Sequence, residues 1–114
     1  MHVAFATDVG REREHNEDTG LVRSFPGGHL LIVCDGMGGH AAGDVASQEA
    51  CTAILEVLAG SINSGRADED PAGTLLRALT VANNQVLARA EEIGQRSMGT
   101  TAVVALVLDR KSVV

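Results

Sequence analysis

The chain alternates polar and apolar residues in short runs near both of its ends, and this pattern predicts β-strands there. A weak alternation at 2–8 and a clearer run at 19–24 indicate two strands. The Phe-Pro-Gly-Gly sequence at 25–28 is typical of a turn, so the strands on either side of it should form a hairpin. The continuous apolar run at 30–34 favours a central strand covered on both faces, and residues 100–108 predict a further strand.

Apolar residues at helical spacing predict a first helix in the middle of the chain. A glycine-rich loop at 35–43 leads into it, Asp44 is expected to cap it, and Gly60 is expected to end it after about Leu58. The stripe that this helix should bury consists of Ala50, Cys51, Ile54, Val57 and Leu58.

A second helix is predicted after a polar surface loop at 63–70. Asp70 and Pro71 together are typical of a cap followed by a first helical turn, and Gly94 should stop the helix. The residues expected on its buried face are Leu75, Leu79, Ala82, Val86 and Ala90.

The order of these elements predicts the fold class. Strands lie at the two ends of the chain and helices lie between them, which indicates an α+β fold rather than alternating βαβ units. The length of 114 residues fits one domain, with no second domain. A turn at 109–111 and the beginning of a strand at 112–114 indicate that the chain has lost its continuation.

The composition fits a globular protein and argues against several functions. With 45% hydrophobic and 21% charged residues, the chain can bury a core and does not resemble a disordered segment. It contains two Phe, no Trp and no Tyr, which argues against a protein that stacks single-stranded bases on aromatic rings. The net charge of -6 argues against a general binder of phosphate backbones, so we expect no nucleic-acid partner.

The chain shows no sign of membrane insertion or of a zinc site. It has no apolar run near the roughly 20 residues that span a bilayer, and its first residues lack the pattern of a signal peptide. We therefore expect no membrane segment and a cytoplasmic location. Cys34 and Cys51 lie in apolar segments, which favours buried free thiols over a disulfide. No CxxC or HxxxH spacing occurs, which argues against zinc.

The glycine-rich stretch at 36–41 fits the dinucleotide pattern G-x-G-x-x-[GA], but its surroundings disfavour nucleotide binding. A second helix follows the first, so no βαβ unit forms, and Glu56 lies within a helix rather than after a second strand. Asp35 directly precedes the first glycine, where its charge would repel a pyrophosphate. Nucleotide binding is the third of three hypotheses for this chain.

Asp35 is better suited to binding a hard cation. A carboxylate at the end of a central strand is held rigidly, and the adjacent glycine lets a backbone carbonyl approach an ion. Glu17 and Asp18 end a charged loop at 9–18 and lead into another strand. If the strands that carry them are neighbours, the three carboxylates converge at one edge, where they offer the oxygen ligands that Mg²⁺ and Mn²⁺ prefer.

Three motifs resemble those of a known family. They are Thr7-Asp8-x-Gly10-x-x-Arg13-x-x-Asn16-Glu17-Asp18, then Asp35-Gly36-Met37-Gly38-Gly39, then Met98-Gly99-Thr100-Thr101. In this order they resemble the N-terminal part of the metal-dependent protein phosphatases, the PPM or PP2C family, and most closely its bacterial branch. The resemblance covers essentially the whole chain. It implies that residues 1–114 are the N-terminal portion of a four-layer α-β-β-α sandwich, in which two antiparallel sheets are flanked by helices.

The resemblance also implies a function and a set of metal-binding residues. The reaction would be hydrolysis of phosphoserine and phosphothreonine in proteins, opposing a Ser/Thr kinase, by a water that two Mg²⁺ or Mn²⁺ ions activate. Asp35 matches the aspartate that bridges the two ions, and the carbonyl of Gly36 matches a further ligand. Glu17 matches a more remote acidic ligand that acts through metal-bound water. Asp18 would orient these ligands by hydrogen bonds.

Two further roles follow from the resemblance. Arg13 matches the arginine that holds the substrate phosphate, for which its guanidinium fork is suited. Arg11 is the alternative, but its spacing to the following carboxylates differs from that of the family. Animal-type members carry a histidine general acid at the position of Met37, and His40, three residues on, is the candidate for that role here.

The chain departs from the family in lacking its later motifs, Gly-Asp-Ser, Ser-Asp-Gly and a terminal Asp-Asn, which complete the metal shells. We therefore expect a fragment of the catalytic domain that is nearly inactive alone. The alternative is a non-catalytic phosphatase-like module that binds a phosphoprotein or a partner domain without hydrolysis.

Overall fold

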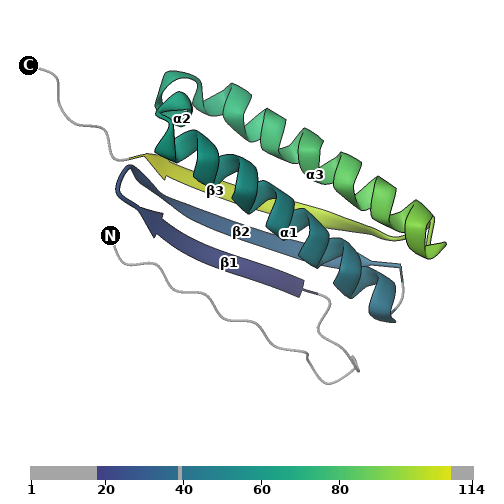
Figure 1. The fold of residues 1–114 in the computed structure, drawn as a ribbon. Coiled ribbons are helices and arrows are strands. Elements are labelled where there is room, and N and C mark those ends of the chain that lie inside the picture. Colours follow the sequence, from purple (N-terminus) through teal and green to yellow (C-terminus); the bar gives the residue numbers. More distant parts are fainter. Residues whose placement is uncertain (1–17, 39, 109–114) are drawn as a thin grey trace, which may run out of the picture.

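A computed structural model describes residues 18–38 and 40–108. The elements in chain order are β1 (Asp18–Phe25), β2 (Gly28–Met37), α1 (His40–Asn63), α2 (Arg66–Glu69), α3 (Pro71–Ile93) and β3 (Gly99–Leu108). Figure 1 shows the three strands in one layer, with α1 and α3 packed across one face of the sheet. The predicted α+β class is confirmed. The strand predicted at 2–8, the turn at 109–111 and the strand at 112–114 lie outside the described residues.

The three strands form one antiparallel sheet in the order β1-β2-β3. The hairpin predicted at 25–28 is confirmed, since Phe25 lies directly opposite Gly28 across the turn. Gly28 is required by close packing, because a Cβ atom there would lie 2.7 Å from the carbonyl oxygen of Val107. All strand pairs among the described residues are antiparallel, so this part of the chain contains no βαβ crossover of the kind that binds dinucleotides.

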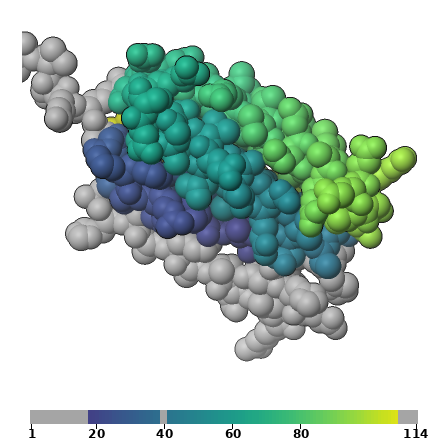
Figure 2. Space-filling view, in the orientation of Figure 1, coloured from purple at the N-terminus to yellow at the C-terminus, as the bar shows by residue number. Residues whose placement is uncertain are grey.

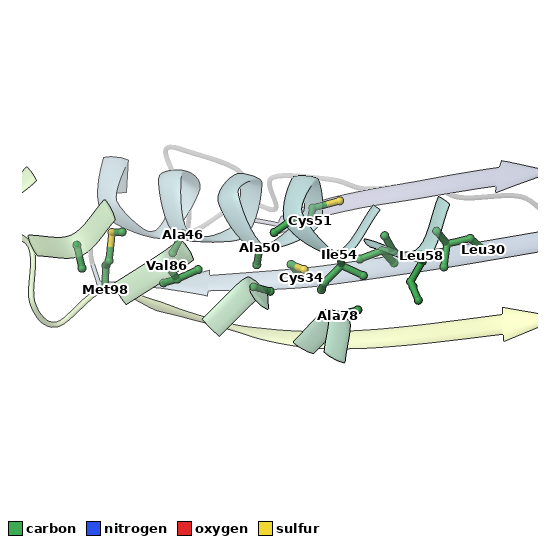
Figure 3. Close-up of a cluster of buried hydrophobic side chains, with 14 of the residues drawn as sticks. Leu30, Cys34, Ala46, Ala50, Cys51, Ile54, Leu58, Ala78, Val86 and Met98 are labelled. Carbon is green, nitrogen blue, oxygen red and sulfur yellow. The ribbon is translucent and has the colours of Figure 1, made fainter. Parts of the chain in front are cut away.

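The core lies between the sheet and the two long helices. Alternate residues of β2 point into it, and Figure 3 shows them against apolar residues of α1. The most buried members are Leu30, Ile32, Cys34, Ala46, Ala50, Ile54, Leu58 and Ala78. In Figure 2 the helices α1 and α3 lie against one another along their length. Alanines on both helices make this close approach sterically feasible, and they leave the bulky side chains to fill the space above the sheet.

The other face of the sheet is not covered by helices within the described residues. Side chains alternate between the two faces of a strand, so Leu31 and Val33 of β2 lie opposite the core and are half-buried. On β3, Val103 is 65% exposed and Val107 is 37% exposed. The prediction that β2 is covered on both faces is therefore met on one face only in this part of the chain.

The stretch predicted as a glycine-rich loop is mostly regular structure. Strand β2 continues through Asp35 and Gly36 to Met37, because β3 pairs with it as far as Gly99. Helix α1 then begins at His40. Between them, Gly38 adopts a φ of +116°, and a Cβ atom there would lie 2.7 Å from the Cα atom of Met98. Only glycine fits this tight connection without strain.

Helix α1 is longer than predicted at both ends. Asp44 is not its cap but lies inside the helix, where its carboxylate accepts a hydrogen bond of 3.1 Å from Gln48 Nε2. Gly60 does not end the helix, which continues to Asn63. Burial of Ser61 and Ile62, at 4% and 7% exposure, explains this, because packing outweighs the roughly 1 kcal/mol that a helical glycine costs.

The start and end of α3 are as predicted, and Ala82, Val86 and Ala90 are buried as predicted, but in the first half of the helix the buried face is rotated. The Asp70 side chain accepts a hydrogen bond of 3.0 Å from the backbone N–H of Gly73, and Gly94 ends the helix in the left-handed conformation. The preceding loop contains the short helix α2, which buries Ala67. The buried residues of α3 are Thr74, Ala78, Ala82, Val86 and Ala90. Leu79 is 42% exposed, and Leu75 is half-buried, as is Val57 of α1.

Candidate metal site at the edge of the sheet

Two of the predicted site carboxylates are brought together by strand pairing. Asp18, the first residue of β1, lies directly opposite Asp35 of β2. Opposed residues of an antiparallel pair have Cβ atoms about 4.5–5.5 Å apart and project to the same face. That face is the one away from α1, since the next residue of β1, Thr19, bonds to Ser47 of the helix at 2.8 Å. Their roles stay predictions.

The main chain of Asp35 is also contacted from the other side, by Thr101 of β3. Thr101 is paired with Asp35 in the strand register. Its Oγ1 accepts a hydrogen bond of 3.3 Å from the Asp35 backbone N–H and donates one of 3.4 Å to the Asp35 carbonyl oxygen. The sequence analysis assigned no role to Thr101 and missed this contact, although the Met98-Gly99-Thr100-Thr101 motif marked the position. Asp18, Asp35 and Thr101 thus form one row across three strands.

The remaining predicted residues divide into described and undescribed positions. Gly36 is buried in β2 opposite Thr100, directly beyond Asp35. His40 is the first residue of α1, and its role as general acid is untested. Glu17, Arg13 and Arg11 lie outside the described residues, so their assignments stay predictions.

The chemistry of the Asp18–Asp35 pair fits a divalent cation. Like charges directly opposite one another on a sheet destabilise it, and a bound cation offsets this repulsion. Carboxylate oxygens are the ligands that Mg²⁺ and Mn²⁺ prefer. Residues 18–38 and 40–108 by themselves gather no group of three or more side chains that could hold a metal. The pair therefore supplies part of a ligand set, to which the undescribed Glu17 is predicted to contribute.

The two cysteines offer no competing nucleophile. Both are buried free thiols, as the sequence predicts. Burial raises the pKa of Cys34 to about 11, with a smaller contribution from Cys51, against a hydrogen bond from Thr100 that lowers it. Burial also raises the pKa of Cys51. Since the thiolate is the reactive form, neither side chain is suited to nucleophilic attack near neutral pH.

No helix in the described part of the chain combines the length and apolarity needed to cross a membrane.

Comparison with known proteins gives consistent matches. A family model described as protein phosphatase 2C matches residues 9–114. The serine/threonine phosphatase stp of Listeria welshimeri is 38% identical over 116 residues, which cover 100% of this chain and 46% of the relative. The serine/threonine protein phosphatase PstP of Mycobacterium tuberculosis is 36% identical over 93% of this chain and 19% of the relative. The chain thus spans about half the length of the Listeria protein, 46% of it.

Solved structures agree with the fold described above. The crystal structure of the Mycobacterium tuberculosis phosphatase PstP/Ppp aligns with a TM-score of 0.59 and 35% identity, over 85% of this chain and 38% of that one. The crystal structure of a mutated bacterial serine phosphatase aligns with a TM-score of 0.64 and 32% identity, over 91% of this chain and 47% of that one. The α+β unit of this chain therefore corresponds to part of a larger fold.

Proposed function

The chain belongs to the protein phosphatase 2C family, and on that premise we propose that it supplies the N-terminal part of a domain that hydrolyses phosphoserine and phosphothreonine in proteins. The observation that carries the proposal is the direct opposition of Asp18 and Asp35 on β1 and β2. The two Listeria and Mycobacterium relatives are named serine/threonine phosphatases, which supports this substrate class. Because the chain matches only 46% of the Listeria relative, the activity belongs to a completed domain.

Asp35 and the carbonyl of Gly36 would hold Mg²⁺ or Mn²⁺ ions, with Glu17 acting through water and Asp18 orienting the ligands. Such ions, when bound, lower the pKa of coordinated water and so supply the attacking nucleophile. Strand β2 fixes the backbone of Asp35 between β1 and β3. A ligand held on paired strands keeps its geometry better than one on a free loop, and catalysis of this kind depends on that geometry.

Arg13 would hold the phosphate of the substrate through two parallel N–H to oxygen bonds. His40, at the start of α1, is the candidate to protonate the leaving serine or threonine oxygen. The expected substrates are phosphorylated proteins of the cytoplasm, on which the enzyme opposes a Ser/Thr kinase.

The test uses a chimera in which this chain replaces the matching part of the Listeria welshimeri phosphatase. The chimera should hydrolyse a phosphothreonine peptide in the presence of Mn²⁺, and Asp35→Asn should remove nearly all of this activity. Asp68→Asn, which alters an exposed carboxylate of α2, is the matched control and should leave the rate unchanged.

The alternative function, a non-catalytic module that binds a phosphoprotein or a partner domain, makes the opposite prediction. A chimera that is folded and binds the phosphopeptide but does not hydrolyse it would favour this alternative. Full activity in the Asp35→Asn chimera would refute the role given to Asp35.

A further inference from the structure

A cavity of about 310 Å³ lies where the end of α1 meets α2 and α3. Arg66 of α2 and Arg77 of α3 line it, together with Gly60 and Ser61 of α1 and Ser64, which follows that helix. Figure 1 shows α2 at the end of the molecule opposite the one where β1 begins and β2 ends. The cavity is therefore remote from the Asp18–Asp35 pair, and it was not anticipated from the sequence.

The two arginines bring positive charge together in an acidic chain. The chain has a net charge of -6, yet two arginines line one cavity. Within the described residues, neither Arg66 nor Arg77 forms an ion pair with a carboxylate. Arg89, on the same helix as Arg77, behaves differently, since it pairs with Glu49 at 3.5 Å and with Glu92 at 2.8 Å. No carboxylate among the described residues therefore neutralises the charge of either arginine at the cavity.

The wall of the cavity is kept open by Gly60. A Cβ atom at this position would meet nothing within 4 Å, so packing does not require glycine there. Glycine in a helix interior is less favourable than alanine, and α1 nevertheless carries it in its last turns. The absence of a side chain at Gly60 leaves one side of the cavity unobstructed.

The hydroxyl groups at the cavity are already engaged as donors. Ser61 Oγ donates to the Val57 carbonyl oxygen at 2.9 Å, and Ser64 Oγ donates to the Ser61 carbonyl oxygen at 3.3 Å. The donors left for a ligand are therefore those of the two arginines. A guanidinium group presents paired N–H donors that match the spacing of oxygens on a phosphoryl group, and a tetrahedral phosphoryl group has enough oxygens to meet two such groups at once.

We propose that this cavity binds a phosphoryl group between Arg66 and Arg77, independently of the metal site. The phosphoryl group belongs either to inorganic phosphate or to a phosphorylated side chain of a peptide. Glu56 also lines the cavity, and its exposed carboxylate weakens binding of a dianion by repulsion. The cavity thus offers two attractive charges and one repulsive charge, and each can be removed separately.

The test is a titration of the 114-residue chain, without metal, with inorganic phosphate and separately with a phosphoserine peptide. Binding is followed by the NMR signals of the arginine side chains and of the Gly60 and Ser64 amides. Arg66→Gln and Arg77→Gln should each weaken binding about three- to fivefold, as expected for one exposed charge contact. Glu56→Gln should strengthen it. Arg96→Gln, which changes an exposed arginine outside the cavity, should have no effect.

Saturable binding of inorganic phosphate supports the proposal. Saturable binding of the phosphoserine peptide but not of inorganic phosphate also supports it, and identifies a phosphorylated side chain as the ligand. Absence of saturable binding by both probes overturns it, as does equal affinity in the Arg66→Gln, Arg77→Gln and unaltered chains. Since no metal and no hydrolysis enter this experiment, its failure is distinguishable from failure of the proposed phosphatase function.

Discussion

Asp18 and Asp35 occupy directly opposed positions on β1 and β2, on the sheet face away from α1. Their opposition follows from the tight hairpin at 25–28, because its turn fixes the register of the whole strand pair. A shift of one residue would turn every side chain of β1 to the other face. It would then place Asp18 against the helices. The local turn chemistry thus determines whether the two carboxylates can serve one cation.

The core between β2 and α1 should be the main source of stability. Ile54 is fully buried, and Ile54→Ala should lower the free energy of unfolding by about 2–5 kcal/mol, because it removes buried apolar surface and leaves a cavity. The measurement is urea-induced unfolding followed by circular dichroism. Leu76→Ala is the control, since Leu76 is 67% exposed and its truncation should change the free energy by less than about 0.5 kcal/mol. Equal losses for the two variants would contradict the described core.

The cap of α3 should contribute less to the free energy of unfolding than the core residue Ile54 does. Asp70→Ala removes the hydrogen bond to the Gly73 amide and should cost about 0.5–2 kcal/mol, the usual range for an N-cap. Asp70→Asn keeps a side-chain acceptor and should restore most of the loss. If both variants unfold at the same urea concentration as the unaltered chain, the side chain does not cap the helix.

Stability should fall at alkaline pH because of Cys34. Its thiol has a pKa near 9.0 in an unfolded chain and about 11 in the folded one, so the folded state holds the proton more tightly. The resulting stabilisation is present below about pH 9 and is lost as the pH rises through 11. Between about pH 9 and pH 11, the free energy of unfolding should fall less steeply with pH in Cys34→Ala than in the unaltered chain. An unchanged pH dependence in that variant would contradict the assignment to Cys34.

The sheet face that helices leave uncovered within residues 18–38 and 40–108 should cause self-association of the isolated chain. Val103 is 65% exposed, and β3 contains no charged residue and no proline to protect its edge. Sedimentation velocity should therefore detect oligomers, and Val103→Lys should reduce them. Leu76→Lys places the same charge on an exposed position of α3 and should not. A chain that stays monomeric at high concentration would show that this face needs no cover.

The sequence predicted correctly those ends of helices and strands that depend only on neighbouring residues. The turn at 25–28, the cap at Asp70 and the stop at Gly94 were predicted from residue type alone, because each depends on φ preference or on a short hydrogen bond. Gly60 and Asp44 misled the prediction of α1. Burial of Ser61 and Ile62, which follow Gly60, extends that helix. Such packing cannot be predicted from the residues next to Gly60.

The sequence predicted one part of the candidate site, the proximity of Asp18 and Asp35, but not the contact of Thr101 with Asp35. The motif order suggested that Asp18 and Asp35 meet, and the register puts them opposite one another. The contact of Thr101 with the Asp35 main chain depends on the pairing of β2 with β3, which the sequence does not specify. Likewise, Arg66 and Arg77 are brought to one cavity by the way α2 leads into α3, and residue type alone gave no sign of it.

Titration with Mn²⁺ of the chimera in which this chain replaces the matching part of the Listeria welshimeri phosphatase, followed by electron paramagnetic resonance of the free ion, tests the central claim that Asp18 and Asp35 serve a divalent cation. The unaltered chimera should bind Mn²⁺ saturably. Asp35→Asn should weaken binding most, and Asp18→Asn should weaken it by about 10–100-fold, as removal of an orienting hydrogen-bond partner does at other metal sites. The Asp68→Asn chimera should bind as the unaltered chimera does. Equal affinity in all four chimeras, or no saturable binding in any of them, would contradict the claim.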